Sequence, residues 1–288
     1  VLGEKLHMSD TRAYKLLPQE ELPHVSPVND HSSLAVYVAL KGYPELGADN
    51  VLNPLTAQEY SRIVGQICRQ AHLEFLRLGE ASREEKIVKR ARIYQLLIEI
   101  ALNTVGLEAD WANIPLRERE KAFSYLKEEL MSLENVEREE YGEPLAARLI
   151  VDHLLGDMKK VMSSNPKRKS MLAWMAERIE KKLSPLRPAS SFLSEAVKEL
   201  QGNAYYQTSK RGLCRFGNDY ALGLRWLRHM GYVQVSTNPV LAAEAYKDDP
   251  SLWDKYKAYL KSHSELIAKA DTDPDTLAMT ATLLALWP

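Results

Sequence analysis

The sequence predicts a mainly α-helical protein in which a helical region, residues 1–202, precedes a short stretch of alternating strands and helices, residues 212–288. Two observations support this class. From about residue 54 to residue 200, apolar residues recur at steps of three and four, which is the period of helices with one buried face. Beyond Gly202 the period changes, and two short apolar runs alternate with helical segments in the order of a parallel β/α unit.

Length and composition indicate an ordinary globular protein. The chain has 288 residues, of which 45% are hydrophobic, so it can bury one large core or two smaller ones, and two domains are expected. A formal charge of -1 creates no field over the whole chain that would attract nucleic acid or an anionic membrane. No apolar run approaches the roughly 18 residues of a membrane span, so a membrane partner is not expected.

The two cysteines, Cys68 and Cys214, make neither a disulfide framework nor a CxxC motif. A reducing cytoplasm is therefore the expected compartment, and both cysteines are interpreted as buried structural thiols. The chain begins with Val1 and ends in an apolar segment, residues 280–288, that needs a covering surface. Both ends are therefore interpreted as cuts from something longer.

The helical region is expected to begin with an irregular lead over residues 1–52, because prolines and glycines are scattered through it. One apolar run at residues 34–40 predicts a short helix within that lead. The first long helix is expected over residues 54–78, where a single apolar face recurs. The sequence Ser82-Arg-Glu-Glu85 is a capping box, which predicts the next helix, up to Gly106.

Four further helices are expected in this region. They run from Pro115 to about Glu140, from Pro144, from Asn165-Pro166 to the loop of Pro185 and Pro188, and from about Ser191 to Leu200. The glutamates between Pro115 and Glu140 are interpreted as a solvated face rather than an acid/base pair. His72 is interpreted as a half-buried helix residue, because no second ligand at a metal-binding spacing accompanies it, and no metal is expected.

One cluster of basic residues suggests nucleic acid. It comprises Lys159, Lys160, Lys167, Arg168, Lys169, Lys181, Lys182 and Arg187. No interleaved aromatic residues and no recognised binding motif accompany these side chains. A solvated helical surface is the preferred interpretation, and nucleic acid is not expected as a partner.

Residues 203–211 form a polar stretch that is interpreted as a linker between the two domains, residues 1–202 and 212–288. The second domain is expected to contain a strand over 213–219, a helix over 221–230, a strand over 232–235, and helices over 239–246, over 250–269 and from Pro274 onward. In α/β proteins, ligands bind at the C-terminal ends of parallel strands. The polar residues at the ends of these two strands, Asp219 and Ser236 to Asn238, therefore form the candidate site.

The run Ser236-Thr237-Asn238-Pro239 resembles the signature of the transaldolase family, in which a strand ends in a Thr-Ser/Thr-Asn-Pro turn followed by apolar helical residues. The family also carries a catalytic aspartate at the end of its first barrel strand, a comparable distance upstream, where Asp219 stands here. Gln234, Val240 and Ala242 depart from the family pattern, so the chain looks like a divergent relative. The resemblance covers residues 212–288, roughly a quarter of the chain.

The resemblance implies the beginning of a parallel (β/α) TIM-type barrel. A closed barrel typically takes about 250 residues, so residues 212–288 hold it only in part. The implied activity belongs to carbohydrate metabolism, in the pentose phosphate pathway. It transfers a dihydroxyacetone unit between sugar phosphates through a lysine Schiff base, without a metal or organic cofactor. The lysines from Lys247 to Lys269 fall in or beside helices, so the Schiff-base lysine is expected beyond residue 288, and this segment alone is expected to be inactive.

Residue roles follow from the same resemblance. Asp219 corresponds to the acid/base that moves a proton to or from the substrate hydroxyl, a role that needs a carboxylate at the mouth of the barrel. Asn238 corresponds to the amide that hydrogen-bonds the substrate or the Schiff base, because an amide both donates and accepts. Ser236 and Thr237 are assigned to substrate binding.

Alternatives remain for these residues and for the chain. Asn238-Pro239 also suits a helix start, with Asn as N-cap and Pro at the first helical position, and Asp219 also suits a cap of the helix that begins near Tyr220. The helical region adds either oligomerisation or shielding of the barrel, so a homo-oligomer or packing on the rest of a longer chain is expected. The alternative function is a helical protein-interaction or oligomerisation module without catalysis, in which the β/α segment is only structural.

Overall fold

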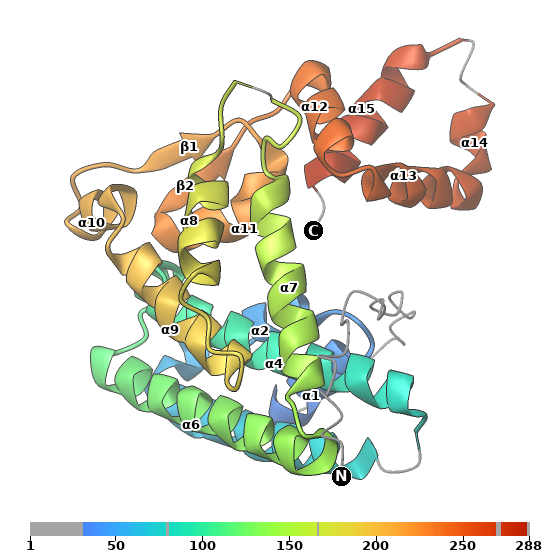
Figure 1. Ribbon diagram of the computed structural model, residues 1–288. Coiled ribbons are helices and arrows are strands. Elements are labelled where there is room, and N and C mark those ends of the chain that lie inside the picture. Colours follow the sequence, from blue (N-terminus) through green and yellow to red (C-terminus); the bar gives the residue numbers. More distant parts are fainter. Residues whose placement is uncertain (1–30, 79–80, 166, 269–271, 287–288) are drawn as a thin grey trace. The chain divides into compact units, whose positions relative to one another are not determined.

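The computed structural model describes residues 31–78, 81–165, 167–268 and 272–286, and its ribbon is mainly helical (Figure 1). The mainly α class is therefore confirmed, together with two parallel strands. Contacts within the chain divide it into two compact units. Unit 1 comprises Val1–His153 and Lys182–Val197, and unit 2 comprises Leu154–Lys181 and Lys198–Pro288.

Most of the expected irregular lead, residues 1–30, lies outside the described residues, as do Pro166, Lys269 and the last two residues. The helices up to the end of α9 are α1 (His31–Leu40), α2 (Pro44–Asp49), η2 (Pro54–Glu59), α3 (Tyr60–Arg77), α4 (Arg83–Val105), α5 (Glu108–Trp111), α6 (Leu116–Tyr141), α7 (Leu145–Lys160), α8 (Met171–Glu180) and α9 (Pro188–Gln201). Helix α4 begins as predicted, because the Ser82 hydroxyl accepts a hydrogen bond from the Glu85 N–H at 3.2 Å. It ends at Gly106, as the sequence indicates.

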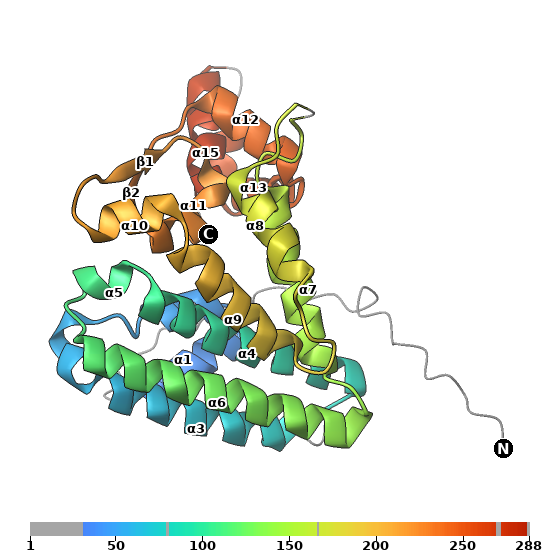
Figure 2. The ribbon, with the colours of Figure 1, turned by 60° about the vertical axis from the view of Figure 1, so that its left-hand side comes forward.

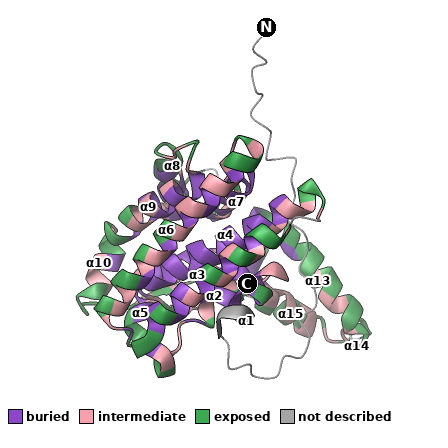
Figure 3. Cartoon of the chain, turned by 90° about the horizontal axis from the view of Figure 1, so that it is seen from below, coloured by how far each residue is buried: buried purple, intermediate pink, exposed green. Residues whose placement is uncertain are grey.

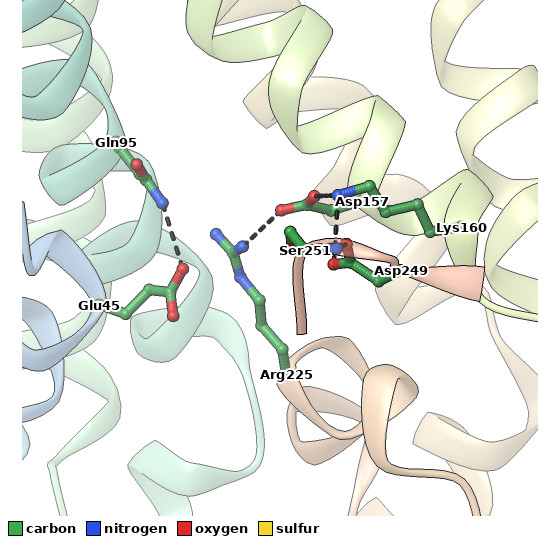
Figure 4. A network of polar contacts seen from close by, with 7 residues as sticks. All are labelled: Glu45, Gln95, Asp157, Lys160, Arg225, Asp249 and Ser251. Atoms are coloured by element: carbon green, nitrogen blue, oxygen red, sulfur yellow. Dashed lines mark hydrogen bonds and ion pairs between the residues drawn. The ribbon is translucent and has the colours of Figure 1, made fainter. Parts of the chain in front are cut away.

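Helix α4 is the buried centre of unit 1, and Figure 3 colours most of its length as buried. Its buried residues include polar ones, whose burial costs free energy unless each is hydrogen-bonded. Asn103 donates to Asp49 at 2.9 Å, and Gln95 donates to Glu45 at 3.2 Å (Figure 4). These bonds hold α2 against α4.

Helices α3 and α6 pack side by side next to α4 (Figure 2). The Ser61 N–H at the start of α3 donates to Glu118 at the start of α6 at 2.9 Å. Further along, His72 Nδ1 lies 2.7 Å from the Glu129 carboxylate. The two helices therefore run in the same direction, and the chain returns between them through α4.

Two helices of the helical region begin elsewhere than expected. Helix α8 begins at Met171 rather than at Asn165-Pro166, with the Ser170 hydroxyl accepting from the Ala173 N–H at 3.1 Å. The Asn165 side chain instead accepts from the Lys167 N–H at 3.0 Å, a local turn that competes with a helix start. Helix α9 begins at Pro188 rather than at Ser191.

Residues 203–211 are predicted as a polar linker. They contain helix α10 (Ala204–Lys210), which is capped by the Asn203 side chain and buries Tyr206. The compact division also differs from the predicted domains, since unit 2 includes residues 154–181 and 198–202 from the helical region. Helical periodicity shows that each helix has an apolar face, but it contains no information about which neighbour covers that face.

In unit 2, strand β1 (Phe216–Asn218) pairs in parallel with strand β2 (Tyr232–Val235), with a bulge after Phe216. The crossover between them is helical, as predicted, and consists of η4 (Ala221–Gly223), α11 (Leu224–Leu227) and η5 (Arg228–Met230). After β2 come α12 (Pro239–Asp248), α13 (Ser251–Ser262), α14 (Ser264–Ile267) and α15 (Pro274–Leu286). A parallel pair needs such a crossover, so this arrangement is a single β/α repeat followed by helices.

Two apolar clusters hold the strands of unit 2 in place. At the N-terminal ends of the strands, the rings of Tyr205, Phe216 and Tyr232 lie with centroids 4.8 to 5.6 Å apart. Beyond their C-terminal ends, helices α12, α13 and α15 bury a small core around Tyr246, against which Tyr220 packs. Aromatic pairs in such geometry add about 0.5–1.5 kcal/mol beyond the area they bury.

Candidate functional site

The C-terminal ends of β1 and β2 lie side by side and carry the site residues predicted from sequence. The Ser236 N–H donates to the Asn218 carbonyl at 2.9 Å, which extends the strand pairing by one bond. The Ser236 hydroxyl donates to the Asp219 carboxylate at 2.7 Å, and both residues are exposed. The structure therefore brings Asp219 and Ser236 together at the edge where parallel α/β folds bind ligands.

Asp219 does not cap the helix that follows it. Helix η4 begins after Tyr220 and has no side-chain cap, so the alternative interpretation of Asp219 as a helix cap is wrong. The carboxylate accepts one hydrogen bond from Ser236 and, being exposed, retains acceptor sites for solvent or a ligand.

Asn238 starts helix α12, as the alternative interpretation of Asn-Pro predicts. Its Oδ1 atom accepts from the Leu241 N–H at 3.0 Å, and Pro239 stands at the beginning of the helix. This cap occupies only the amide oxygen, and the residue is exposed. The side-chain NH2 group is thus oriented by the cap and can donate to another molecule.

Thr237 lies between these two residues. Its hydroxyl oxygen is buried and has no hydrogen-bond partner among the described residues. That hydroxyl lies in the chain between an exposed serine and an exposed amide, and it has hydrogen-bonding capacity left for a ligand.

Two lysines of α12 and α13 are held in ion pairs. Lys247 pairs with Glu244 at 2.6 Å and Lys257 with Asp254 at 2.9 Å, and all four side chains are largely exposed. A lysine that attacks a carbonyl must be neutral, which requires a desolvated or cationic environment. Neither of these paired lysines has that environment.

Sequence reasoning missed a buried carboxylate behind the site. Asp248, at the end of α12, is 7% exposed and accepts a hydrogen bond from the hydroxyl of Tyr220, the residue after Asp219. Beside it, Asp249 bonds Lys160, and Lys160 also pairs with Asp157 (Figure 4). The only signal in the sequence was Asp249-Pro250, which indicates a helix start and no more.

The interpretation of the α6 glutamates as a solvated face is wrong for two of them. Glu134 and Glu137 are fully buried, one helical turn apart. Glu137 accepts from the N–H groups of Ala146 and Ala147 at the start of α7, at 2.9 and 3.2 Å. Glu134 accepts from the N–H groups of Ala189 and Ser190 at the start of α9, at 2.7 and 3.1 Å. Both are therefore caps supplied from another helix, which satisfy N–H groups that a helix leaves unpaired.

A cysteine, a histidine and a glutamate gather between α3 and α6 without forming a nucleophilic site. His72 is half-buried, as predicted, and its Nδ1 atom lies 2.7 Å from Glu129. Burial raises the pKa of the Glu129 carboxyl. Burial also raises the pKa of the Cys68 thiol to about 12, so the thiolate that catalysis needs is absent at neutral pH. Cys68 is a buried thiol, as expected, whereas Cys214 is exposed, because it precedes β1 in a stretch of exposed residues.

Four of the eight residues of the basic cluster between residues 159 and 187 pair with acids. Lys159 bonds Glu180 at 2.8 Å, Lys160 bonds two aspartates, and Lys182 bonds Glu195 at 3.3 Å. Lys169 likewise pairs with Glu177. Each pair neutralises a charge that a phosphate backbone would otherwise attract, which favours the interpretation of a solvated helical surface.

Among the described residues, no group of three or more His, Cys, Asp or Glu side chains is arranged to hold a metal ion. Over the same residues, every helix is too short or too polar to span a bilayer. No protein-family model, no curated protein and no solved structure matches the chain. The residues at the strand ends are therefore what indicates a function for this chain.

Proposed function

We propose that residues 212–288 open a transaldolase-like (β/α) barrel, of which they hold only the first part. The natural protein would transfer a dihydroxyacetone unit between sugar phosphates through a lysine Schiff base. The observation that carries this proposal is the 2.7 Å hydrogen bond from Ser236 to Asp219, at the C-terminal ends of two parallel strands. The Ser236-Thr237-Asn238-Pro239 run lies at the same strand end, next to an exposed acid.

In this proposal Asp219 acts as the acid/base. It accepts a proton from the substrate hydroxyl as the carbon–carbon bond breaks and returns it as the new bond forms. The Ser236 hydroxyl holds the carboxylate by its hydrogen bond. Asn238 donates to the substrate or the Schiff base through its NH2 group, since its oxygen caps α12, and the unpaired Thr237 hydroxyl binds substrate. No metal or organic cofactor takes part.

The Schiff-base lysine belongs, in this proposal, beyond residue 288. The ion pairs of Lys247 and Lys257 with exposed carboxylates support that assignment, because a paired ammonium is not a nucleophile. Residues 1–288 alone are then expected to be inactive. A cytoplasmic location belongs to the same proposal and is supported by the free thiols of Cys68 and Cys214.

Borohydride reduction with fructose 6-phosphate tests the proposal on the natural protein, expressed from its own start codon to its own stop codon. Mass spectrometry should find a three-carbon adduct on a lysine outside residues 1–288. In Asp219→Asn the six-carbon adduct should accumulate instead, because the Schiff base still forms but the bond no longer breaks. Asp254→Asn, an exposed aspartate of α13, should behave like the unaltered protein. If no lysine is modified, the protein is not a transaldolase-like enzyme, and the non-catalytic interaction module becomes the better proposal.

Packing against further protein is part of the proposal. Helix α15 is apolar on all sides, yet Met279 and Leu283 are 55% and 57% exposed. Helices with that pattern are normally buried. Either the rest of a longer chain or a second copy covers this face. Sedimentation of the natural protein tests the second copy: a dimer that Leu283→Glu dissociates indicates a second copy, and a stable monomer excludes it.

A further inference from the structure

Asp248 joins three segments of unit 2 that are far apart in the sequence. Its side chain accepts the Ser164 N–H at 2.6 Å and the Ser163 hydroxyl at 3.2 Å, both from the turn that follows α7. It also accepts the hydroxyl of Tyr220, immediately after β1. Because Asp248 is buried and accepts three hydrogen bonds, each bond lost leaves a buried polar group less well satisfied.

Tyr220 carries this connection to the end of β1. Its ring packs against the core of α12, α13 and α15, and its hydroxyl bonds Asp248. Burial, reinforced by that carboxylate, raises the pKa of Tyr220, so the hydroxyl remains a donor at neutral pH. The carbonyl of Tyr220 also accepts from the Asn218 side chain. The backbone on the C-terminal side of Asp219 is therefore held from two directions.

The turn after α7 is itself firmly placed. Met162 adopts a positive φ of 60°, a conformation that a non-glycine residue adopts only where its surroundings enforce it. The end of α7 is also tied to the β/α segment, because Asp157 pairs with Arg225 of α11 at 2.9 Å and Lys160 pairs with Asp249 at 3.3 Å (Figure 4). These pairs make residues 157–164 part of the support of the strands.

We propose that Asp248 is a positioning residue for Asp219. Asp248 is held by the Ser163-Ser164 turn and in turn holds Tyr220, the residue that follows Asp219. The helical region thus contributes to the site through its turn at residues 163–164, which holds Asp248. The catalytic part of this inference rests on the proposed function, whereas the structural part does not.

The structural part predicts how fast the Ser236 amide exchanges with deuterium. That N–H bonds the Asn218 carbonyl at 2.9 Å, directly beside Asp219, so its exchange rate reports how often the strand ends separate. Tyr220→Phe removes one hydroxyl and should speed this exchange about tenfold, equivalent to about 1.4 kcal/mol. Asp248→Asn should have a similar effect, since an amide cannot accept all three bonds.

Tyr256→Phe is the matched control. The Tyr256 ring packs against the same core, and its hydroxyl donates to the Leu277 carbonyl at 3.3 Å, away from the strands. Exchange of the Ser236 amide should be unchanged in this variant. The inference is overturned if the Ser236 amide exchanges equally fast in the Tyr220 and Tyr256 variants. It is also overturned if neither Tyr220→Phe nor Asp248→Asn changes that exchange rate.

The catalytic part is tested by steady-state kinetics on the natural protein. Tyr220→Phe should lower kcat about tenfold and leave KM unchanged, because the substrate still binds while the acid/base is misplaced. A rise in KM at constant kcat would instead make Tyr220 part of substrate binding and overturn the positioning role. If the unaltered protein has no activity, the proposed function fails, and the exchange rates still decide the structural part.

Discussion

Replacing Glu137 by glutamine tests which force decides the charge of a carboxylate in the core of unit 1. Glu137 is fully buried on α6, and each of its oxygens accepts one backbone N–H from the start of α7. Those bonds, the charge of Arg90 and the neighbouring Tyr94 side chain favour the ionised form of Glu137. Burial opposes them and is the largest effect, raising the pKa of Glu137 to about 7.

The sign of the pH dependence follows from that direction. An unfolded chain releases this proton near pH 4.5, whereas the folded chain holds it up to about pH 7. The stabilisation that this proton contributes is therefore complete below pH 4.5, and it is lost as the pH rises through about 7. Between 4.5 and 7, at about 1.36 kcal/mol per pH unit, the loss comes to about 3 kcal/mol of unfolding free energy.

Guanidinium denaturation from pH 4.5 to pH 8 measures this loss in the chain and in Glu137→Gln. The unaltered chain should lose about 3 kcal/mol more than the variant across that range. Burial also raises the pKa of Glu134, which acts in the same direction but is present in both proteins, so it cancels in the difference. Glu139→Gln, an exposed residue on the same helix, should follow the unaltered chain. The reasoning is refuted if the unfolding free energy of the unaltered chain, relative to that of Glu137→Gln, stays constant or increases with pH. The two backbone N–H groups would then keep Glu137 ionised.

Replacing either of two glycines by alanine should change the stability, measured by thermal unfolding, in opposite directions. A Cβ at Gly47 would lie 2.7 Å from the Ala35 carbonyl oxygen, so Gly47→Ala should destabilise by about 1–3 kcal/mol, whereas at Gly156 nothing lies within 4 Å, so Gly156→Ala should stabilise by about 0.5–1 kcal/mol. A stabilising Gly47→Ala would contradict the packing of α2 on α1, and a destabilising Gly156→Ala would contradict the open space at Gly156. Asn238→Ala should cost about 1 kcal/mol through the lost cap, and Asn238→Asp should cost almost nothing. If the amide NH2 also binds substrate, both variants should lose activity in the natural protein, so full activity in Asn238→Asp would remove Asn238 from the site.

Local patterns predicted much of the secondary structure. Ser82 caps α4, Asn238 caps α12, and the two short apolar runs form parallel strands joined by a helix. These features depend on residues within a few positions of one another, and their energetics act within a single turn or strand. The start of α8 was predicted wrongly for the same reason, because Asn165-Pro166 and Ser170 compete locally and the sequence alone does not rank them.

By itself, the sequence determined the helical class, the β/α repeat and the strand end that carries Asp219 and Ser236, because periodicity and caps are encoded within short segments. Only the tertiary structure decided which acids are buried. Glu134 and Glu137 lie on a helix face that is otherwise rich in charge, and Asp248 is buried by a turn about 85 residues upstream. A carboxylate becomes structural when distant N–H and O–H groups surround it, and that arrangement arises only when the whole chain packs.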